Sequence, residues 1–197
     1  TTKINPNDAD LVIFLQAPAA AKIAGVLGIR ACGDVKAGMI TPVHKPRGAK
    51  KATETLVEMI GEAKQPLLIC GGGVVRGRAH EEFREFPRRI DAPVAITLMG
   101  GGGFPGNHEL ATGMIGMHGS QASNMAVDAC DLLIAVGCRF SDRVALKPDT
   151  FARNAKIVHI DIDRSEIDKN VLTDHHIIGS ARKVLTALKD KLDAILR

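Results

Sequence analysis

From about Glu54 onward, the hydrophobic and polar positions follow two alternating patterns. Short, nearly continuous apolar runs at residues 66–70, 92–98, 131–137, 155–163 and 175–179 predict buried strands. Between these runs, apolar residues recur every three or four positions, which predicts amphipathic helices. Strands that alternate with helices are typical of α/β proteins with a parallel sheet.

Local signals place the helices. The predicted helices cover residues 52–65, 78–90, 120–129, 164–170 and 180–196. Pro66 stops the first helix, whose apolar face is formed by Leu56, Val57, Ile60 and Ala63. Ser120 is placed to cap the third. The last helix has an inward face made of Val184, Leu185, Leu188, Leu192 and Ile195.

The count of strands is about six, and helices separate them. Crossovers of this kind are right-handed and place helices on both faces, so we expect a doubly wound, Rossmann-like parallel sheet. The N-terminal part differs. Residues 8–16 and 18–29 resemble one more strand and a helix, and residues 33–51 are turn-rich and basic. We therefore interpret residues 1–50 as a linker or partial unit and residues 51–197 as one nucleotide-binding α/β domain.

Composition narrows the class of protein. Hydrophobic residues make up 45% and charged residues 24%, and no apolar stretch approaches the ~20 residues of a membrane span, so disorder and a membrane protein are both disfavoured. The net charge of +4 comes from scattered basic residues. The chain has no Trp, no Tyr and only six Phe, whereas nucleic-acid binders combine a basic stripe with stacking aromatic residues. We expect no nucleic-acid partner.

The four cysteines form no closely spaced pair, and three of them lie in or beside apolar runs. This pattern is typical of reduced, buried thiols rather than a disulfide or zinc framework. It predicts an intracellular, cytoplasmic protein.

In a sheet of this type, ligands bind beyond the carboxyl ends of the strands. Gly71, Gly72 and Gly73 follow the first strand, where bare amides at a helix start can approach a phosphate; a simple tight turn is the alternative. Met99–Pro105 follows the second strand as a glycine-rich loop. It is either a wrap around an extended ligand or an ordinary loop.

Two further groups follow the later strand ends. The "GMHG" stretch offers Met117 and His118 as contacts for a flat aromatic ligand. Arg139, Asp142 and Arg143 come soon after the strand at 131–137, and two guanidinium groups suit a phosphate or a carboxylate. An Arg–Asp pair that only holds the loop together is the alternative.

Two aspartates follow the strand at 155–163. Asp161 and Asp163 can accept hydrogen bonds from ribose hydroxyls, although Asp163 can instead cap the next helix. His159 lies inside the strand, and we expect it to be structural. These strand ends together favour a dinucleotide laid across the edge of the sheet. We find no nucleophile with a base, and no metal-ligand spacing, so the chain is interpreted as a cofactor holder with the chemistry elsewhere.

Four stretches carry a resemblance to a known family. "PLLICGGGV", "APVAITLMGGGGFPGNHEL", "GMIGMHGSQASNMAVDACDLLIAVGCRFSDRV" and "AKIVHIDIDRSEIDKN" closely resemble the central domain of acetohydroxyacid synthase, also called acetolactate synthase. The order of the "GMHG", "GCRFSDRV" and "HIDID" blocks makes this resemblance specific. It covers roughly Thr53 to Leu192 and does not extend to the first 45 residues.

The resemblance implies a cofactor and its contacts. In that family the central domain binds FAD in an extended pose, and thiamine diphosphate with Mg²⁺ lies between two sister domains of a homo-oligomer. The implied FAD contacts are Gly71, Gly72, Gly73, Thr97, Leu98, Met117, His118, Gly137, Arg139, Asp142, Arg143, Asp161 and Ile162. Asp142 and Arg143 would also lie near the channel that leads to thiamine diphosphate. The full enzyme condenses two 2-keto acids with loss of CO2 in branched-chain amino-acid biosynthesis.

The sequence also departs from the family pattern. Ser141 stands where the family usually has an acidic residue, and "VALKP" replaces the usual Val-Thr-Gly. The thiamine-activating glutamate and the metal-binding GDG motif, which belong to the sister domains, are not found. We therefore expect no carboligase activity from this chain alone.

Three other interpretations stay open. One is a stand-alone nucleotide-binding or regulatory module. Another is the central domain of a different thiamine-diphosphate enzyme that binds ADP or nothing, such as a glyoxylate carboligase or sulfoacetaldehyde acetyltransferase relative. A more distant alternative is an NAD-dependent deacylase, which shares a similar sheet but has zinc-type cysteine pairs.

Overall fold

The computed structural model describes residues 32–36, 39–44 and 48–195. The chain divides after Ala52 into two units. The strand and helix expected at residues 8–16 and 18–29, and the side chain of Ile195, lie outside what is described.

The N-terminal unit contains a two-stranded antiparallel sheet. Strand β1 (Cys32–Lys36) pairs with β2 (Met39–His44). The turn-rich interpretation of residues 33–51 is wrong for these two strands. Pro42 lies inside β2 and lacks a backbone donor, so it resembles a strand breaker in the sequence, yet a two-stranded ladder has only edges and tolerates it.

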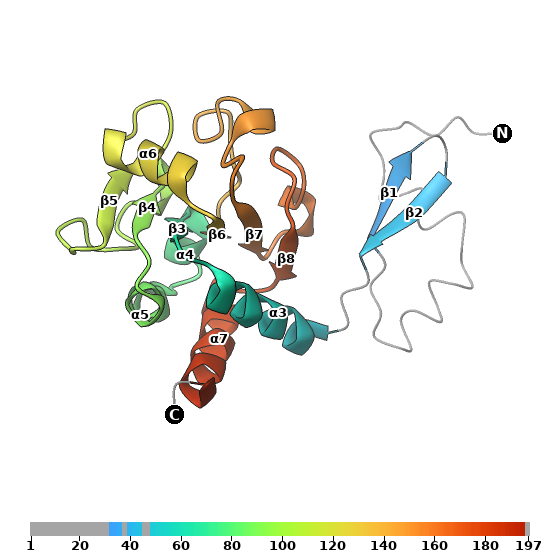
Figure 1. The fold of residues 1–197 in the computed structure, drawn as a ribbon, viewed down its shortest axis with the longest axis horizontal. Helices are drawn as coiled ribbons and strands as arrows, with labels where there is room; N and C mark the ends of the chain where they lie inside the picture. Colours follow the sequence, from blue (N-terminus) through green and yellow to red (C-terminus); the bar gives the residue numbers. More distant parts are fainter. Residues whose placement is uncertain (1–31, 37–38, 45–47, 196–197) are drawn as a thin grey trace. The chain divides into compact units, whose positions relative to one another are not determined.

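The second unit is built on one six-stranded, all-parallel sheet (Figure 1). Its order is β5-β4-β3-β6-β7-β8, and the strands are β3 (Pro66–Cys70), β4 (Val94–Ile96), β5 (Ala111–Met114), β6 (Leu132–Val136), β7 (Lys156–Asp161) and β8 (His175–Ile178). The chain therefore starts at the centre, builds outward to one edge, returns and builds to the other edge. This is the doubly wound Rossmann order, and the predicted fold class is confirmed.

One strand of the sheet was missed. Strand β5 lies at the edge, and the sequence analysis assigned no element there. Its sequence, ATGM, has no apolar run, its four residues are all half-buried, and Gly113 has a φ of 105°. The register with β4 also shifts between Val94 and Ala95. An irregular edge strand of this kind leaves no clear hydrophobic period.

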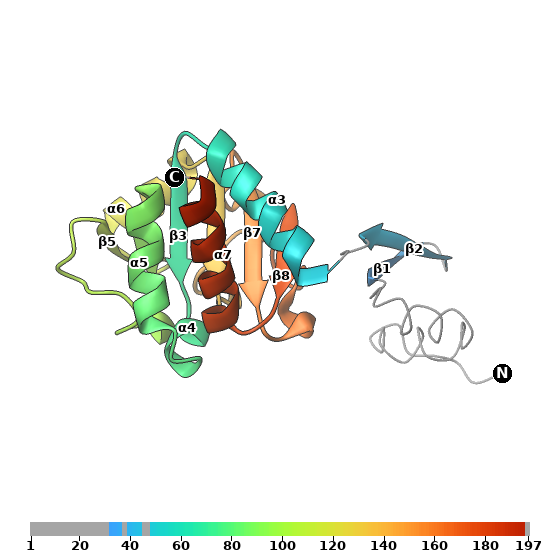
Figure 2. The same ribbon diagram turned by 90° about the horizontal axis from the view of Figure 1, so that it is seen from below.

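Helices cover both faces of the sheet. Figure 2 shows α3, α5 and α7 side by side across one face, whereas α6 lies on the other side of the sheet in Figure 1. Their bounds are α3 (Gly48–Glu62), α5 (His80–Ile90), α6 (Gln121–Ala129) and α7 (Ala181–Ile195). The predicted inward residues Val184, Leu185, Leu188 and Leu192 of α7 are buried.

The strands are apolar on both faces because helices or loops cover both. In β3, Leu67 and Ile69 belong to the core cluster beneath α6, which also contains Val127, while Leu68 and Cys70 alternate with them and are fully buried. Burial of an aliphatic side chain of this size stabilises the fold by about 2 kcal/mol. Continuous burial explains why these strands read as unbroken apolar runs.

Short helices end several of the predicted elements early. The strand expected to reach residue 98 stops at Ile96, because Thr97 caps the 3₁₀ helix η1 (Leu98–Gly100) by accepting a hydrogen bond from Gly100 N. The helix expected at 164–170 is only the 3₁₀ turn η3 (Arg164–Glu166). Two more such segments are α4 (Gly72–Arg76) and η2 (Pro148–Thr150).

The described cysteines of the second unit are buried thiols, as expected. Cys70, Cys130 and Cys138 are all free. Burial raises the pKa of each thiol to about 12, so they stay protonated at neutral pH. None of the helices within the described ranges is long and apolar enough to cross a membrane.

Candidate functional site

The centre of the site is the point where the strand order reverses. Strands β3 and β6 are neighbours, and the chain leaves their carboxyl ends toward opposite edges of the sheet. The loops that leave β3 and β6 meet closely there. A Cβ atom on Gly71 would lie 2.1 Å from Gly137 O, and one on Gly137 would lie 2.4 Å from Gly73 Cα. Only glycine fits this crossing.

The crossing also uses backbone amides of the glycine triplet. Gly71 N donates to Val136 O and Gly73 N donates to Gly137 O, both at 2.9 Å. These two amides bind the neighbouring strand end, so they are not bare groups directed at a ligand. The tight-turn interpretation therefore describes Gly71 and Gly73, and only Gly72 keeps an amide without a hydrogen bond among the described residues.

A cavity of about 730 Å³ lies on one side of the crossing. This volume is in the range of ordinary small-molecule sites. Its lining combines apolar side chains with Arg76, Arg139, Arg143 and His118 and contains no carboxylate. The apolar part comes from Leu98, Met99, Met114, Ile115, Phe140 and Val144. An anionic ligand with a flat apolar portion fits this chemistry.

The apolar side chains at the carboxyl edge are unusually exposed. Leu98 is 77% and Met99 67% exposed, and Ile162 beside the second cavity is 72% exposed. Water contact of large apolar side chains is unfavourable. Their grouping along one edge of the sheet is typical of a surface that a ligand or another protein surface covers.

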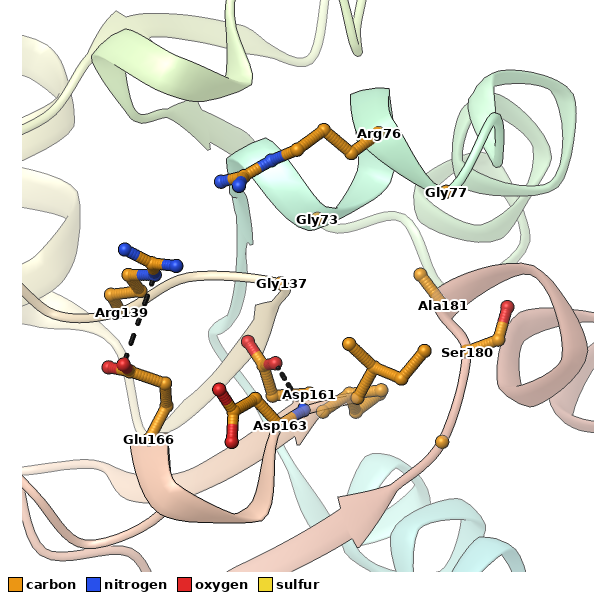
Figure 3. Close-up of a pocket in the computed structure, with 13 residues that line it drawn as sticks. Gly73, Arg76, Gly77, Gly137, Arg139, Asp161, Asp163, Glu166, Ser180 and Ala181 are labelled. Atoms are coloured by element: carbon orange, nitrogen blue, oxygen red, sulfur yellow. Dashed lines mark hydrogen bonds and ion pairs between the residues drawn. The ribbon is translucent and has the colours of Figure 1, made fainter.

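A second cavity, of about 290 Å³, lies on the other side of the crossing (Figure 3). It carries the carboxylates of Asp161, Asp163 and Glu166, together with Ser180. In Figure 3 these groups and the guanidinium groups of Arg76 and Arg139 surround one opening. The smaller cavity therefore offers hydrogen-bond acceptors, which suit hydroxyl groups.

Asp161 is held in its ionised form. Burial raises the pKa of Asp161, but the nearby His159 imidazole and the amides of Asp163 and Ile162 outweigh it, so the pKa lies below its usual value. Asp163 N donates to Asp161 Oδ1 at 2.9 Å. His159 Nε2 lies 3.7 Å from Asp161 Oδ2, which is too far for a hydrogen bond.

Two residues near Asp161 have structural roles that the sequence analysis had considered. Asp163 caps η3, because its Oδ1 accepts from Ser165 N at 2.9 Å. His159 is fully buried and packs edge-to-face against Phe140, with ring centroids 5.0 Å apart. Asp163 lines the smaller cavity as well as capping η3.

The loop after β6 is anchored by an alternation of buried and exposed residues. Cys138 and Phe140 are 2% exposed and belong to the core, whereas Arg139 and Ser141 are exposed toward the larger cavity. Phe140 takes a φ of 48°, which is strained for a side chain of this size. The buried ring fixes the turn and so directs Arg139 outward.

The "GMHG" loop is fastened to the β6 loop and to α6. Met117 N donates to Arg143 O at 2.9 Å, and Arg143 Nη1 lies 3.5 Å from Met117 Sδ. Asn124 of α6 both accepts from Gly116 N, at 3.0 Å, and donates to Gly116 O, at 3.1 Å. Ser120 caps α6 as predicted, since its Oγ accepts from Ser123 N. Three segments of the chain thus form one wall.

Most of the predicted contact residues lie along this edge. The two cavities are lined by Gly72, Gly73, Thr97, Leu98, His118, Gly137, Arg139, Arg143, Asp161 and Ile162. Gly71, Met117 and Asp142 line neither cavity. Gly71 is buried below the crossing, Met117 contacts Arg143, and Asp142 is exposed and lies 3.6 Å from Arg143 as the Arg–Asp pair of the alternative interpretation.

Sequence reasoning missed three residues of the site. Arg76 lines both cavities, Glu166 lies 3.9 Å from Arg139 Nε, and Asn124 holds the "GMHG" loop. Arg76 carried a signal, because it follows the glycine triplet by one helical turn and therefore returns to the strand end. Glu166 lies far along the chain from Arg139, and Asn124 lies on a predicted helix apart from the "GMHG" loop, and neither gave a signal.

Comparisons with known proteins agree with this geometry. Residues 53–188 match the family model described as "Thiamine pyrophosphate enzyme, central domain". The chain belongs to this family. The match covers the six-stranded sheet and both cavities, so the site lies inside the matched region.

Individual relatives are similar over the same region. The chain is 47% identical over 156 residues to the "Probable acetolactate synthase large subunit" of Methanocaldococcus jannaschii, covering 78% of this chain and 26% of the relative. It is 48% identical over 153 residues to the "Acetolactate synthase large subunit" of Corynebacterium glutamicum, covering 78% and 24%. This central domain therefore spans about a quarter of the length of these relatives, and the family resemblance seen in the sequence is confirmed.

Within the described part of the chain, no group of three or more His, Cys, Asp or Glu residues is arranged to hold a metal ion. The carboxylates of the smaller cavity are instead engaged by amides, by Arg139 and by Lys169.

Proposed function

We propose that this chain is the FAD-binding central domain of an acetolactate synthase, which condenses two 2-keto acids with loss of CO2. The observation that carries the proposal is the pair of cavities that meet at the strand-order reversal, one apolar and cationic and the other rich in carboxylates. The names of the relatives support the assignment of the whole enzyme.

The residues present fit FAD. The flat flavin ring would pack on the apolar wall near Leu98 and His118, and water would be excluded from the exposed apolar groups there. Arg139 and Arg143 would bind the phosphates, since guanidinium groups form charge-assisted hydrogen bonds with them. Ionised Asp161 would accept from ribose hydroxyls.

Local departures from the family lie beside the proposed ring site. Ser141 lines the larger cavity, and its carbonyl accepts from Val144 N and Ala145 N, which closes the turn. The Ser141 side chain carries no negative charge toward the ring. A flavin bound here would therefore meet a less negative wall than in relatives with an acidic residue at this position.

Thiamine diphosphate, when bound, supplies the carbanion chemistry of this family. We place it and its Mg²⁺ in sister domains outside this chain, with Asp142 and Arg143 facing the channel toward it. The role of the chain's own residues is to bind the flavin, to orient it and to cover it from water. A cytoplasmic homo-oligomer is the expected assembly of the whole enzyme.

FAD titration of the full 197-residue chain tests the proposal. With no Trp or Tyr in the chain, bound flavin dominates the near-ultraviolet and visible spectrum, so binding is followed through flavin absorbance and fluorescence. We expect saturable binding that Arg139→Gln weakens at least about tenfold. Arg84→Gln, an equal loss of charge on the exposed side of α5, should leave it unchanged. Absence of binding by the unmodified chain would overturn the proposal.

A further inference from the structure

Arg76 occupies the junction of the two cavities. It is the last residue of α4, and its side chain folds back toward the start of that helix, so that Nη2 would lie 3.1 Å from a Cβ atom on Gly72. Of the residues that the structure describes, only Arg76, Gly137 and Arg139 line both cavities. Gly137 has no side chain, so the junction offers a ligand two functional side chains, both of them guanidinium groups.

The charge of Arg76 is not compensated within the described part of the chain. Arg139 Nε lies 3.9 Å from Glu166, and Arg143 Nε lies 3.6 Å from Asp142. No carboxylate lies within 4 Å of Arg76, and it makes no hydrogen bond there. Figure 3 shows its guanidinium group extending from α4 over the same side of the opening as Arg139.

We propose that Arg76 is a ligand-binding residue that contacts the diphosphate of a nucleotide extended through both cavities. The inference rests on the proposed function, because an extended dinucleotide places its diphosphate between its ring system and its ribose. The junction separates the apolar cavity from the carboxylate-rich cavity in the same order. The diphosphate is the only doubly charged part of such a ligand, and Arg76 and Arg139 flank its position.

The diphosphate is favoured over the other parts of the ligand by charge. A ribose would gain more from Asp161 and Asp163, which are acceptors, than from a guanidinium donor with no acceptor beside it. A flavin ring would gain more from the apolar wall. The anionic part is therefore the one that this unpaired cation recognises.

Binding measurements on the full chain with four probes test Arg76. Calorimetry compares FAD and ADP, which contain a diphosphate, with riboflavin and adenosine, which do not. We expect Arg76→Gln to bind FAD and ADP about tenfold more weakly and to bind riboflavin and adenosine as the unmodified chain does. Arg76→Lys, which keeps the charge but not the planar fork, should lie between the two.

Arg78→Gln is the matched control. It removes the same charge two residues away from a side chain that lines neither cavity. We expect Arg78→Gln to bind all four probes as the unmodified chain does. The loss of FAD affinity caused by Arg76→Gln should be smaller at about 1 M salt than at low salt, because exposed charges are then screened within ~3 Å. Thermal melting of each variant should match that of the unmodified chain.

The outcomes separate the two proposals. If the unmodified chain binds FAD and Arg76→Gln binds it equally well, or loses adenosine to the same degree, the role of Arg76 is overturned while the proposed function stands. If the unmodified chain binds neither FAD nor ADP, both are overturned.

Discussion

Gly137 is the residue on which the centre of the site depends most closely. Its φ is 60°, and its Cα side faces Gly73 so closely that a methyl group would lie 2.4 Å from Gly73 Cα and 2.8 Å from Gly73 N. The loops after β3 and β6 can cross only because neither residue has a side chain. Moving the two loops apart would also change the junction of the two cavities, which Arg76 and Arg139 line.

Gly137→Ala should therefore destabilise the fold. The left-handed φ and the steric overlap together predict a loss of about 3 kcal/mol in the free energy of unfolding. Urea denaturation measures it. Gly61→Ala is the control, because Gly61 lies in α3 with no atom within 4 Å of the added Cβ, and it should raise the free energy by about 0.5 kcal/mol. A loss below about 1 kcal/mol for Gly137→Ala would show that the crossing can relax.

At the residue scale, the sequence predicts which chemical groups lie at the strand ends better than it predicts which side chains contact each other. Asp161 and Arg139 were expected at strand ends and lie there, because the end of a buried strand is visible as the end of an apolar run. The sequence did not predict that Met117 Sδ lies 3.5 Å from Arg143 Nη1, across 26 residues of sequence. Such long-range pairings have no period in the sequence and follow only from the assembled fold.

At the scale of elements, Asp131 connects the segment before β3 to the start of β6. Its carboxylate accepts from Lys64 N at 2.7 Å and from Gln65 N at 2.9 Å. These amides, with Lys64 the larger contribution, hold the pKa of Asp131 below its usual value. The ionised form is thus favoured in the folded protein.

This lowered pKa predicts a pH-dependent contribution to stability. The stabilisation is present above the unfolded pKa of ~3.9 and disappears as pH falls through the lower folded value. Asp131→Asn should lower the free energy of unfolding by about 1 kcal/mol at pH 7, a figure reduced for the partial exposure of the group. The difference should vanish in strong acid.

Chemical denaturation over a range of pH measures this difference. Asp128→Asn, an exposed carboxylate on α6, serves as control and should show little change at any pH. A difference between Asp131→Asn and the unmodified chain that stays constant with pH would contradict the role of the carboxylate charge.

Elements with strong patterns were predicted and irregular ones were not. Helix α7 and strands β3, β6 and β7 have clear apolar periods, and the burial of Leu188 and Ile160 follows them. Strand β5 and the β1–β2 pair lack such periods. The expected helix after β7 ends after one turn, since Ile167 is extended and Asp168 takes a φ of 57°. Local backbone preference of this kind outweighs helical spacing in a short segment.

At the scale of the whole molecule, the order of strands decides where the ligand site lies. Strands β3 and β6 are adjacent and lead to opposite edges, so their loops cross at the carboxyl edge of the sheet and the two cavities lie on either side of this crossing. The fold class predicts this location without any single residue. The sequence predicted the doubly wound sheet, since strands and helices alternate along the chain. The division into two chemically distinct cavities follows only from the assembled loops.

The chain alone should not form acetolactate. We expect no product from pyruvate even with added FAD, thiamine diphosphate and Mg²⁺, because the proposed function assigns thiamine diphosphate and its metal to sister domains. A colorimetric acetolactate assay, with a full-length acetolactate synthase run in parallel, measures this. Product above that of heat-denatured chain would show that the chemistry is not confined to other domains.

Hydrogen exchange with and without FAD tests the central claim most directly, because it reports where the ligand lies on the folded chain. We predict that FAD slows exchange in residues 72–76, 97–99, 137–143 and 161–163, at the carboxyl edge of the sheet. Residues 64–65 and 131, at the amino edge, should exchange at the same rate. Protection at the amino edge alone, or none when FAD is saturating, would contradict a flavin site at the strand-order reversal.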